Sequence, residues 1–119
     1  MATFTKKKLS GSTDGLAIKV TGTSTAATVT VHTAVAGTTA GVFDEIWLYA
    51  NNTSTSAVKL TLEWGTATAA DGNIELTIAA ESGLVLVVPG LILQNTKVVK
   101  AFAATADVIL LTGYVNQIS

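Results

Sequence analysis

Apolar and polar residues alternate along most of the chain from Leu16 onward. A period of two is typical of β-strands that bury one face and expose the other. Short groups of Gly, Asn, Asp, Ser or Pro, which favour turns, separate the alternating segments. The pattern predicts eight short strands, at residues 16–20, 27–35, 43–50, 57–64, 74–79, 84–88, 97–104 and 108–115, with a turn at Pro89-Gly90.

Many short strands with regular turns predict an all-β fold of about eight antiparallel strands, either a β-sandwich or a jelly roll. The length of 119 residues fits one domain. Residues 1–15 differ from the rest, because they are polar and carry three consecutive lysines. We therefore expect an N-terminal arm at residues 1–15, flexible or docked on a neighbour, followed by a sandwich domain at residues 16–119.

The strand expected at residues 43–50 is largely apolar on both sides. One side carries aliphatic residues, namely Ile46, Leu48 and Ala50. The other side carries Glu45 and an aromatic row, namely Phe43, Trp47 and Tyr49. This row could belong to the sandwich core, anchor a protein interface, or form a platform for a sugar. The alternation alone leaves these three roles open.

Other strands predict a single buried side. The inward residues are Val29, Val31, Thr33 and Val35 in the second strand, Val58, Leu60, Leu62 and Trp64 in the fourth, and Ile74, Leu76 and Ile78 in the fifth. The single histidine, His32, falls among outward threonines and is predicted to lie on the surface. Lys59, Thr61 and Glu63 are likewise predicted to point out.

Residues 84–88 and 108–111 are apolar on both faces. In an antiparallel sandwich only one face of a strand meets the core, so the other face needs its own cover. A bare apolar strand would aggregate. Another subunit could provide the cover, and so could loops or the arm of the same chain. We expect a subunit interface, with Leu84 and Leu86 among its contacts.

The chain is poor in residues that do chemistry. It has no cysteine, no arginine, one histidine and eight carboxylates, against 20 threonines, 18 alanines and 13 valines. His32 has no cluster of further metal ligands, and Asp44 and Glu45 point to opposite faces of one strand. No Gly-x-Ser-x-Gly or phosphate-binding glycine motif occurs. The sequence predicts no enzyme, with no catalytic, cofactor-binding or metal-binding residue and no cofactor.

The charge pattern limits the class of partner. Net charge is −1 and only 13% of the residues are charged, so we expect neither nucleic acid nor a membrane as partner. The one basic cluster is Lys6, Lys7 and Lys8. It is either a solvated tail or a contact to an acidic protein surface. The composition favours a protein that works by presenting surfaces to other proteins.

Three segments resemble small all-β virion proteins of tailed bacteriophages, specifically head decoration (cement) proteins. They are EIWLYANNTSTSAVKLTLEWG at residues 45–65, IAAESGLVLVVPGLIL at 78–93 and VVKAFAATADVILLTGYVNQI at 98–118. The resemblance covers about the last two-thirds of the chain. It implies a jelly-roll-like sandwich, commonly a homotrimer, that sits on the assembled capsid and ties neighbouring major capsid subunits together.

The resemblance also places the protein on the phage head surface, after synthesis in the bacterial cytoplasm, with the major capsid protein and itself as partners. Residues 1–15 would reach a neighbouring subunit. We expect contacts from Lys6, Lys7 and Lys8 toward the shell, and from Phe43, Trp47, Tyr49, Leu84 and Leu86 at a subunit or shell interface. The alternatives are another virion part, such as a tail, neck or fibre-head protein, and a carbohydrate-binding module.

Overall fold

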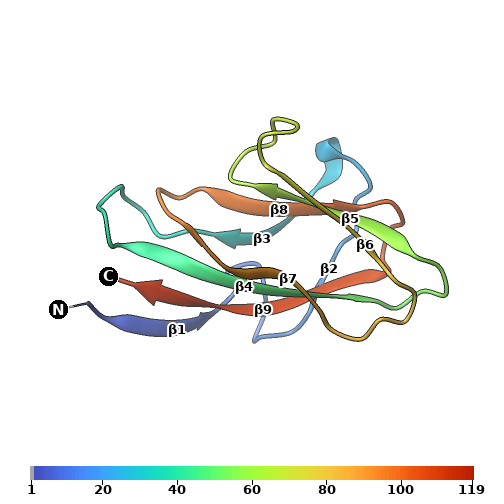
Figure 1. Cartoon of the computed structure of the whole chain (residues 1–119), viewed down its shortest axis with the longest axis horizontal. Helices are drawn as coiled ribbons and strands as arrows, with labels where there is room; N and C mark the ends of the chain where they lie inside the picture. Colours follow the sequence, from blue (N-terminus) through green and yellow to red (C-terminus); the bar gives the residue numbers. More distant parts are fainter. Residues whose placement is uncertain (1) are drawn as a thin grey trace.

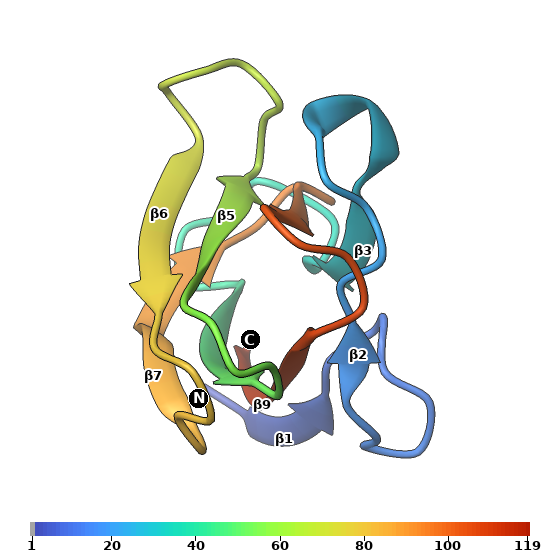
Figure 2. The same ribbon diagram turned by 90° about the vertical axis from the view of Figure 1, so that its right-hand side faces the viewer.

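The computed structural model describes residues 2–119, which form two antiparallel sheets packed face to face (Figure 1; end view in Figure 2). Sheet A contains β1 (Phe4–Lys8), β2 (Ile18–Lys19), β4 (Phe43–Asn52), β7 (Val85–Leu93) and β9 (Ile109–Ile118). Sheet B contains β3 (Val29–Thr33), β5 (Val58–Trp64), β6 (Asn73–Ile78) and β8 (Val98–Ala103). A single 3₁₀ turn, η1 (Thr25–Ala27), lies between β2 and β3.

Apart from β1, the strands pair in a nested order. β2 pairs with β9, β3 with β8, β4 with β7 and β5 with β6, all antiparallel. This is the order of one long hairpin folded over into two sheets, which defines a jelly roll. The predicted antiparallel sandwich of jelly-roll type is confirmed, with nine strands instead of eight.

The core lies between the sheets and follows the predicted alternation of β4. Ile46, Leu48 and Ala50 are 0% exposed, whereas Phe43, Trp47 and Tyr49 lie half-buried on the outer face. Sheet B contributes fully buried aliphatic side chains from each of its strands, among them Val31, Leu60, Leu62, Ile78 and Val99. Removing such side chains from water is the main stabilising contribution to the fold, since each is worth about 1.5–3 kcal/mol. The aromatic row is therefore not part of the core.

The N-terminal segment contains a strand that the lysine-rich sequence did not predict. β1 pairs antiparallel with β9, from Phe4 opposite Ile118 to Lys8 opposite Tyr114. Leu9, directly after β1, is 1% exposed and anchors the segment in the core. Residues 4–8 are thus the edge of sheet A and do not form an arm apart from the sandwich. Lysines on an edge strand oppose pairing with foreign strands.

β7 continues through Pro89-Gly90, where the sequence predicted a turn. Two register shifts occur along its pairing with β4, and Gly90 adopts a φ of +80°. β7 is an edge strand, and proline is tolerated there because its missing N–H need not serve a neighbour. The exposed apolar segment consequently extends to Leu93 instead of ending at Val88.

Residues 108–111 are covered within the same chain. Ile109 and Leu111 are 0% exposed. Leu110 is half-buried on the other face, where the register places it between Lys19 of β2 and Asn51 of β4. The chain's own strands therefore cover much of this segment, while a subunit interface at the half-buried Leu110 remains an expectation.

The predicted faces of two adjacent residues in sheet B are wrong, and three others differ from the prediction in how far they are exposed. A bulge between Thr30 and His32 turns His32 inward, so this histidine is 4% exposed, not on the surface, while Thr33 is exposed. Leu76 lies opposite the buried Leu60 but remains 37% exposed, because β6 is an edge strand. Thr61 and Glu63 lie on the predicted outer face, opposite Phe102 and Lys100, but they are buried there.

A buried polar network surrounds His32 and ties the sheets together. The Ser10 N–H donates to His32 Nδ1 at 3.0 Å, so the ring proton sits on Nε2, which lies 2.7 Å from Asp44 Oδ2. The Gln117 amide donates to Asp44 Oδ1 at 3.0 Å, and the Val35 N–H donates to Oδ2 at 3.2 Å. Asp44 is 2% exposed. The network links β3 and β4 with β9 and the segment after β1.

Asp44→Ala is expected to lower the free energy of unfolding by about 3–5 kcal/mol, since it leaves buried donors without their acceptor. Chemical denaturation measures the change. Glu75→Ala is the control, because its ion pair with Lys59 (3.1 Å) is exposed to water and such pairs are worth about 1 kcal/mol or less. Equal losses in the two variants would contradict the structural role of the network.

Candidate functional site

The two outer faces of the sandwich differ in character. On sheet B, Lys59 pairs with Glu75 at 3.1 Å, and Lys100 lies opposite Glu63 in the register. Glu63 is buried and accepts a hydrogen bond at 2.5 Å from Oγ1 of Thr25, the first residue of η1. The outer face of sheet A instead carries aromatic and aliphatic side chains. This difference marks sheet A as the candidate site.

The strand register gathers these side chains into rows across sheet A. Phe4 of β1 and Phe43 of β4 both lie opposite Ile118 of β9. Further along, Trp47 lies opposite Tyr114, and Tyr49 lies opposite Leu86 of β7. We call this surface the aromatic face; its residues are Phe4, Phe43, Trp47, Tyr49, Tyr114 and Ile118. Phe4 is 72% exposed, and the others are half-buried.

A stack of side chains crosses the centre of the aromatic face. The rings of Trp47 and Tyr114 are 6.2 Å apart between centroids, with 14° between their planes. Lys6 Nζ lies 4.4 Å from the centroid of Tyr114. On the other side, Trp47 lies against Gly90, where a Cβ atom would come within 2.9 Å of the indole. The stack therefore needs glycine at this position of β7.

This packing limits what the rings can bind. Stacking on a sugar or a base needs a free aromatic face. Trp47 is flanked by Tyr114 and Gly90, and Tyr114 by Trp47 and Lys6. These neighbours leave less of the two rings free for a flat ligand and hold them in place. Rings held in this way suit packing against a protein surface.

Glu45 fixes the orientation of the indole. Its Oε1 accepts hydrogen bonds from Trp47 Nε1 at 2.7 Å and from the Asn116 amide at 3.1 Å. The bond from Trp47, and secondly that from Asn116, lowers the pKa of Glu45 below its ordinary value. The carboxylate is consequently ionised at neutral pH and holds Trp47 in place.

The three predicted lysines lie together on β1, and only part of the run reaches the aromatic face. Lys6 covers Tyr114, while Lys7 Nζ donates to Gln117 Oε1 at 2.9 Å. Lys8 lies opposite Tyr114 in the register. All three are exposed. Lys6 and Lys8 border the aromatic face with positive charge, whereas Lys7, opposite Val115, lies on the other side of β1.

Leu84 and Leu86, predicted from the sequence as interface residues, are 67% and 45% exposed. The structure adds Leu91 and Ile92, which are 44% and 55% exposed. Sequence reasoning missed these two because it placed a turn at Pro89-Gly90. Leu86 lies opposite Tyr49 and Ile92 opposite Glu45, so β7 extends the aromatic face to the edge of the sheet.

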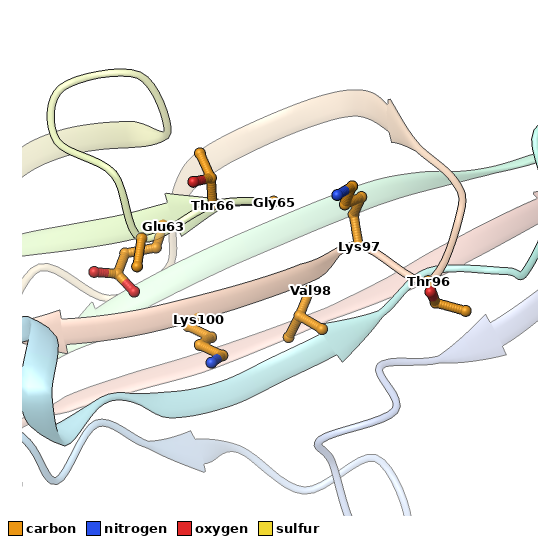
Figure 3. Close-up of a pocket in the computed structure, with 8 residues that line it drawn as sticks. Glu63, Gly65, Thr66, Thr96, Lys97, Val98 and Lys100 are labelled. Carbon is orange, nitrogen blue, oxygen red and sulfur yellow. The ribbon is translucent and has the colours of Figure 1, made fainter.

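Two surface pockets include charged or titratable side chains in their lining. A pocket of about 390 Å³ includes His32 and Asp44 in its lining, but both nitrogens of the His32 ring already have partners. A second, of about 230 Å³, lies beside β5 and β8 (Figure 3). Its charged residues, Glu63, Lys97 and Lys100, point in different directions and do not converge on one point.

Among residues 2–119, no group of three or more His, Cys, Asp or Glu side chains could hold a metal ion. The same residues form no helix that is long and apolar enough to cross a membrane. Comparisons of the chain with protein-family models, with curated proteins and with solved structures find no match.

The lowered pKa of Glu45 predicts a pH-dependent signal from Trp47. Stabilisation by the ionised carboxylate is present above the pKa of the unfolded chain and is lost as pH falls through the lower pKa of the folded state. We expect Trp fluorescence to change with a midpoint below 4.5, the ordinary value for Glu. Glu45→Gln should lack this transition, while Trp64 contributes equally to both proteins. A midpoint above 4.5, or an unchanged transition in the variant, would contradict this assignment.

Proposed function

We propose that the protein is a structural component of a tailed-phage virion, a head decoration protein that docks the aromatic face of sheet A onto the assembled capsid. The observation that carries this proposal is the contrast between the two outer faces. Sheet B presents paired charges to water, whereas sheet A presents rigid aromatic edges bordered by lysines.

The aromatic face has the composition of a protein interface. Tyr, Trp and Phe are enriched at the centres of such interfaces, and charged residues are depleted there. Trp47 and Tyr114 are already held by their neighbours, so docking would cost little conformational entropy. Lys6 and Lys8 would lie at the rim, where they suit an acidic surface of the major capsid protein, and Lys7 on the other side of β1 would add to the positive charge of the strand.

The fold agrees with this role without determining it. Jelly rolls occur in viral capsid domains and also in lectins and cupins, so the topology alone is an analogy. The neighbours packed on Trp47 and Tyr114 leave less ring surface for a sugar, which favours the virion role over a carbohydrate-binding module. A shell repeats its binding sites, so weak contacts of a self-associating protein add up through avidity.

Trp47→Ala is expected to weaken binding to capsids that lack this protein by roughly thirtyfold, because a central aromatic anchor is worth about 2 kcal/mol or more. Co-sedimentation with such capsids measures the effect. Phe102→Ala is the matched control, an aromatic truncation on the outer face of sheet B, where Phe102 lies opposite Thr61. Circular dichroism verifies the fold of both variants. Undiminished binding of the Trp47 variant, or an equal loss in the control, would refute the docking face.

Replacing Lys6, Lys7 and Lys8 together by Gln should reduce capsid binding and make the remainder less sensitive to salt. Rim charges act through long-range attraction, which dissolved ions screen. The same co-sedimentation at several NaCl concentrations provides the measurement. Substitution keeps β1 in the sheet, which deletion of the segment would not. An unchanged salt dependence would show that the lysines serve only to protect the edge of sheet A.

A further inference from the structure

The first described residues of the chain connect the edge of sheet A to sheet B, and we call residues 3–12 the N-terminal strap. At one end the Thr3 N–H donates to the Ser119 carbonyl oxygen at 2.6 Å. β1 then runs along the edge of β9. At the other end the Gly11 N–H donates to the carbonyl oxygen of Val31 in β3 at 2.9 Å. The strap is thus held to both sheets by backbone hydrogen bonds.

One further contact of the strap involves a group whose charge depends on pH. The Ser10 N–H donates to His32 Nδ1 at 3.0 Å, and Nδ1 can accept this bond only while it carries no proton. An imidazolium carries a proton on both nitrogens. Protonated His32 would therefore set its own Nδ1–H against the Ser10 N–H. The closed strap excludes this proton, whereas a strap that has moved away permits it.

Asp44 is the acidic group that faces His32, and it does so in either position of the strap. Its Oδ2 lies 2.7 Å from His32 Nε2, and its carboxylate is also held by the Val35 N–H and the Gln117 amide, which do not belong to the strap. Glu45, the other carboxylate of β4, lies on the outer face. Asp44 therefore attracts a proton to the ring in both states and does not by itself favour one of them.

The cations that face His32 belong to the strap. Lys7 and Lys8 line the same pocket as His32, so their charges oppose an imidazolium while the strap is closed and move away with β1 when it opens. From the other strands, β8 places the uncharged Val99 opposite His32, and β9 contributes the uncharged Gln117 to the pocket. Both interactions that change on opening, the Ser10 hydrogen bond and the lysine charges, thus disfavour the proton in the closed state.

We propose that His32 is a pH-sensitive latch, and that protonation of its ring shifts the N-terminal strap from the closed position to one detached from both sheets. The shift occurs as the pH falls from about 8 to about 5, the range in which histidine gains its charge. Because opening takes up one proton, the ratio of open to closed strap rises by up to about tenfold per pH unit. The latch is a property of the chain alone and does not depend on capsid docking.

The open strap would change the surface that the sandwich presents. The edge of β9 would lose its partner β1, and its backbone groups could then pair with another strand. Lys6 would also leave the ring of Tyr114, which uncovers one side of the stack in the aromatic face. The latch thereby connects pH to the shape of sheet A.

Amide hydrogen exchange, followed by NMR at about pH 7.5 and about pH 5, tests the proposal. The Gly11 N–H reports on the strap. The Ala103 N–H, which donates to the Gly22 carbonyl oxygen at 3.1 Å from a fully buried residue, reports on opening of the whole sandwich. Protection factors remove the direct effect of pH on the exchange chemistry. We expect the protection of Gly11 relative to Ala103 to fall at least tenfold at the lower pH, which still leaves Glu45 ionised.

His32→Asn is the matched control, because Asn Oδ1 can accept the Ser10 N–H but takes up no proton in this range. The variant should keep the relative protection of Gly11 the same at both pH values. Unchanged relative protection of Gly11 in the native chain, or the same loss in the folded Asn variant, would overturn the latch.

A second measurement uses the unmodified chain and remains valid if the Asn variant fails to fold. His32 is the only histidine, so its ring protons give a single NMR titration. The loss of Gly11 protection should follow this titration. A ring that titrates while the strap stays closed would contradict the proposal. Neither measurement contains capsid, so failure of the latch is distinguishable from failure of docking.

Discussion

The pairing of β9 with β4 is the interaction on which the rest of the structure depends. It runs over ten residue pairs, from Phe43 opposite Ile118 to Asn52 opposite Ile109. Inward residues of these two strands supply the core of sheet A, and outward residues place Trp47 against Tyr114. The other edge of β9 also holds β1 and β2. One ladder therefore builds the hydrophobic core, positions the aromatic face and fixes the N-terminal segment.

Alternation along the sequence predicted the strands and both faces of β4, because a half-buried strand must repeat every two residues. It could not predict β1, whose lysines carry no apolar signal and whose position depends on β9. It also failed at Pro89, which is tolerated only because β7 is an edge, and at His32, which a bulge turns inward. Each failure arises from a neighbouring strand that is distant in sequence. The candidate residues Trp47 and Leu86 were predictable, but Tyr114, which packs beside Trp47, and the exposed Leu91 and Ile92 of β7 were not.

Several of the polar side chains make hydrogen bonds that stabilise the fold. His32, Asp44 and Ser10 form a buried network, and the hydrogen bonds of Glu45 hold an indole in place. The outward surfaces differ in the side chains they carry. Sheet B carries paired charges, sheet A carries packed aromatic rings, and β7 exposes uncharged apolar side chains. Apolar side chains are thus exposed mainly on the aromatic face and on β7, which continues it to the edge of sheet A.

The central claim is that sheet A, and not sheet B, faces the capsid shell. Electron cryomicroscopy of heads reconstituted with this protein tests it most directly, because the sandwich is asymmetric enough to be oriented in a reconstruction. The account predicts density for the sandwich on the outside of the shell, with Trp47 and Tyr49 toward the major capsid protein and Lys59 and Glu75 toward solvent. Density with sheet B against the shell, or heads without bound protein, would contradict it.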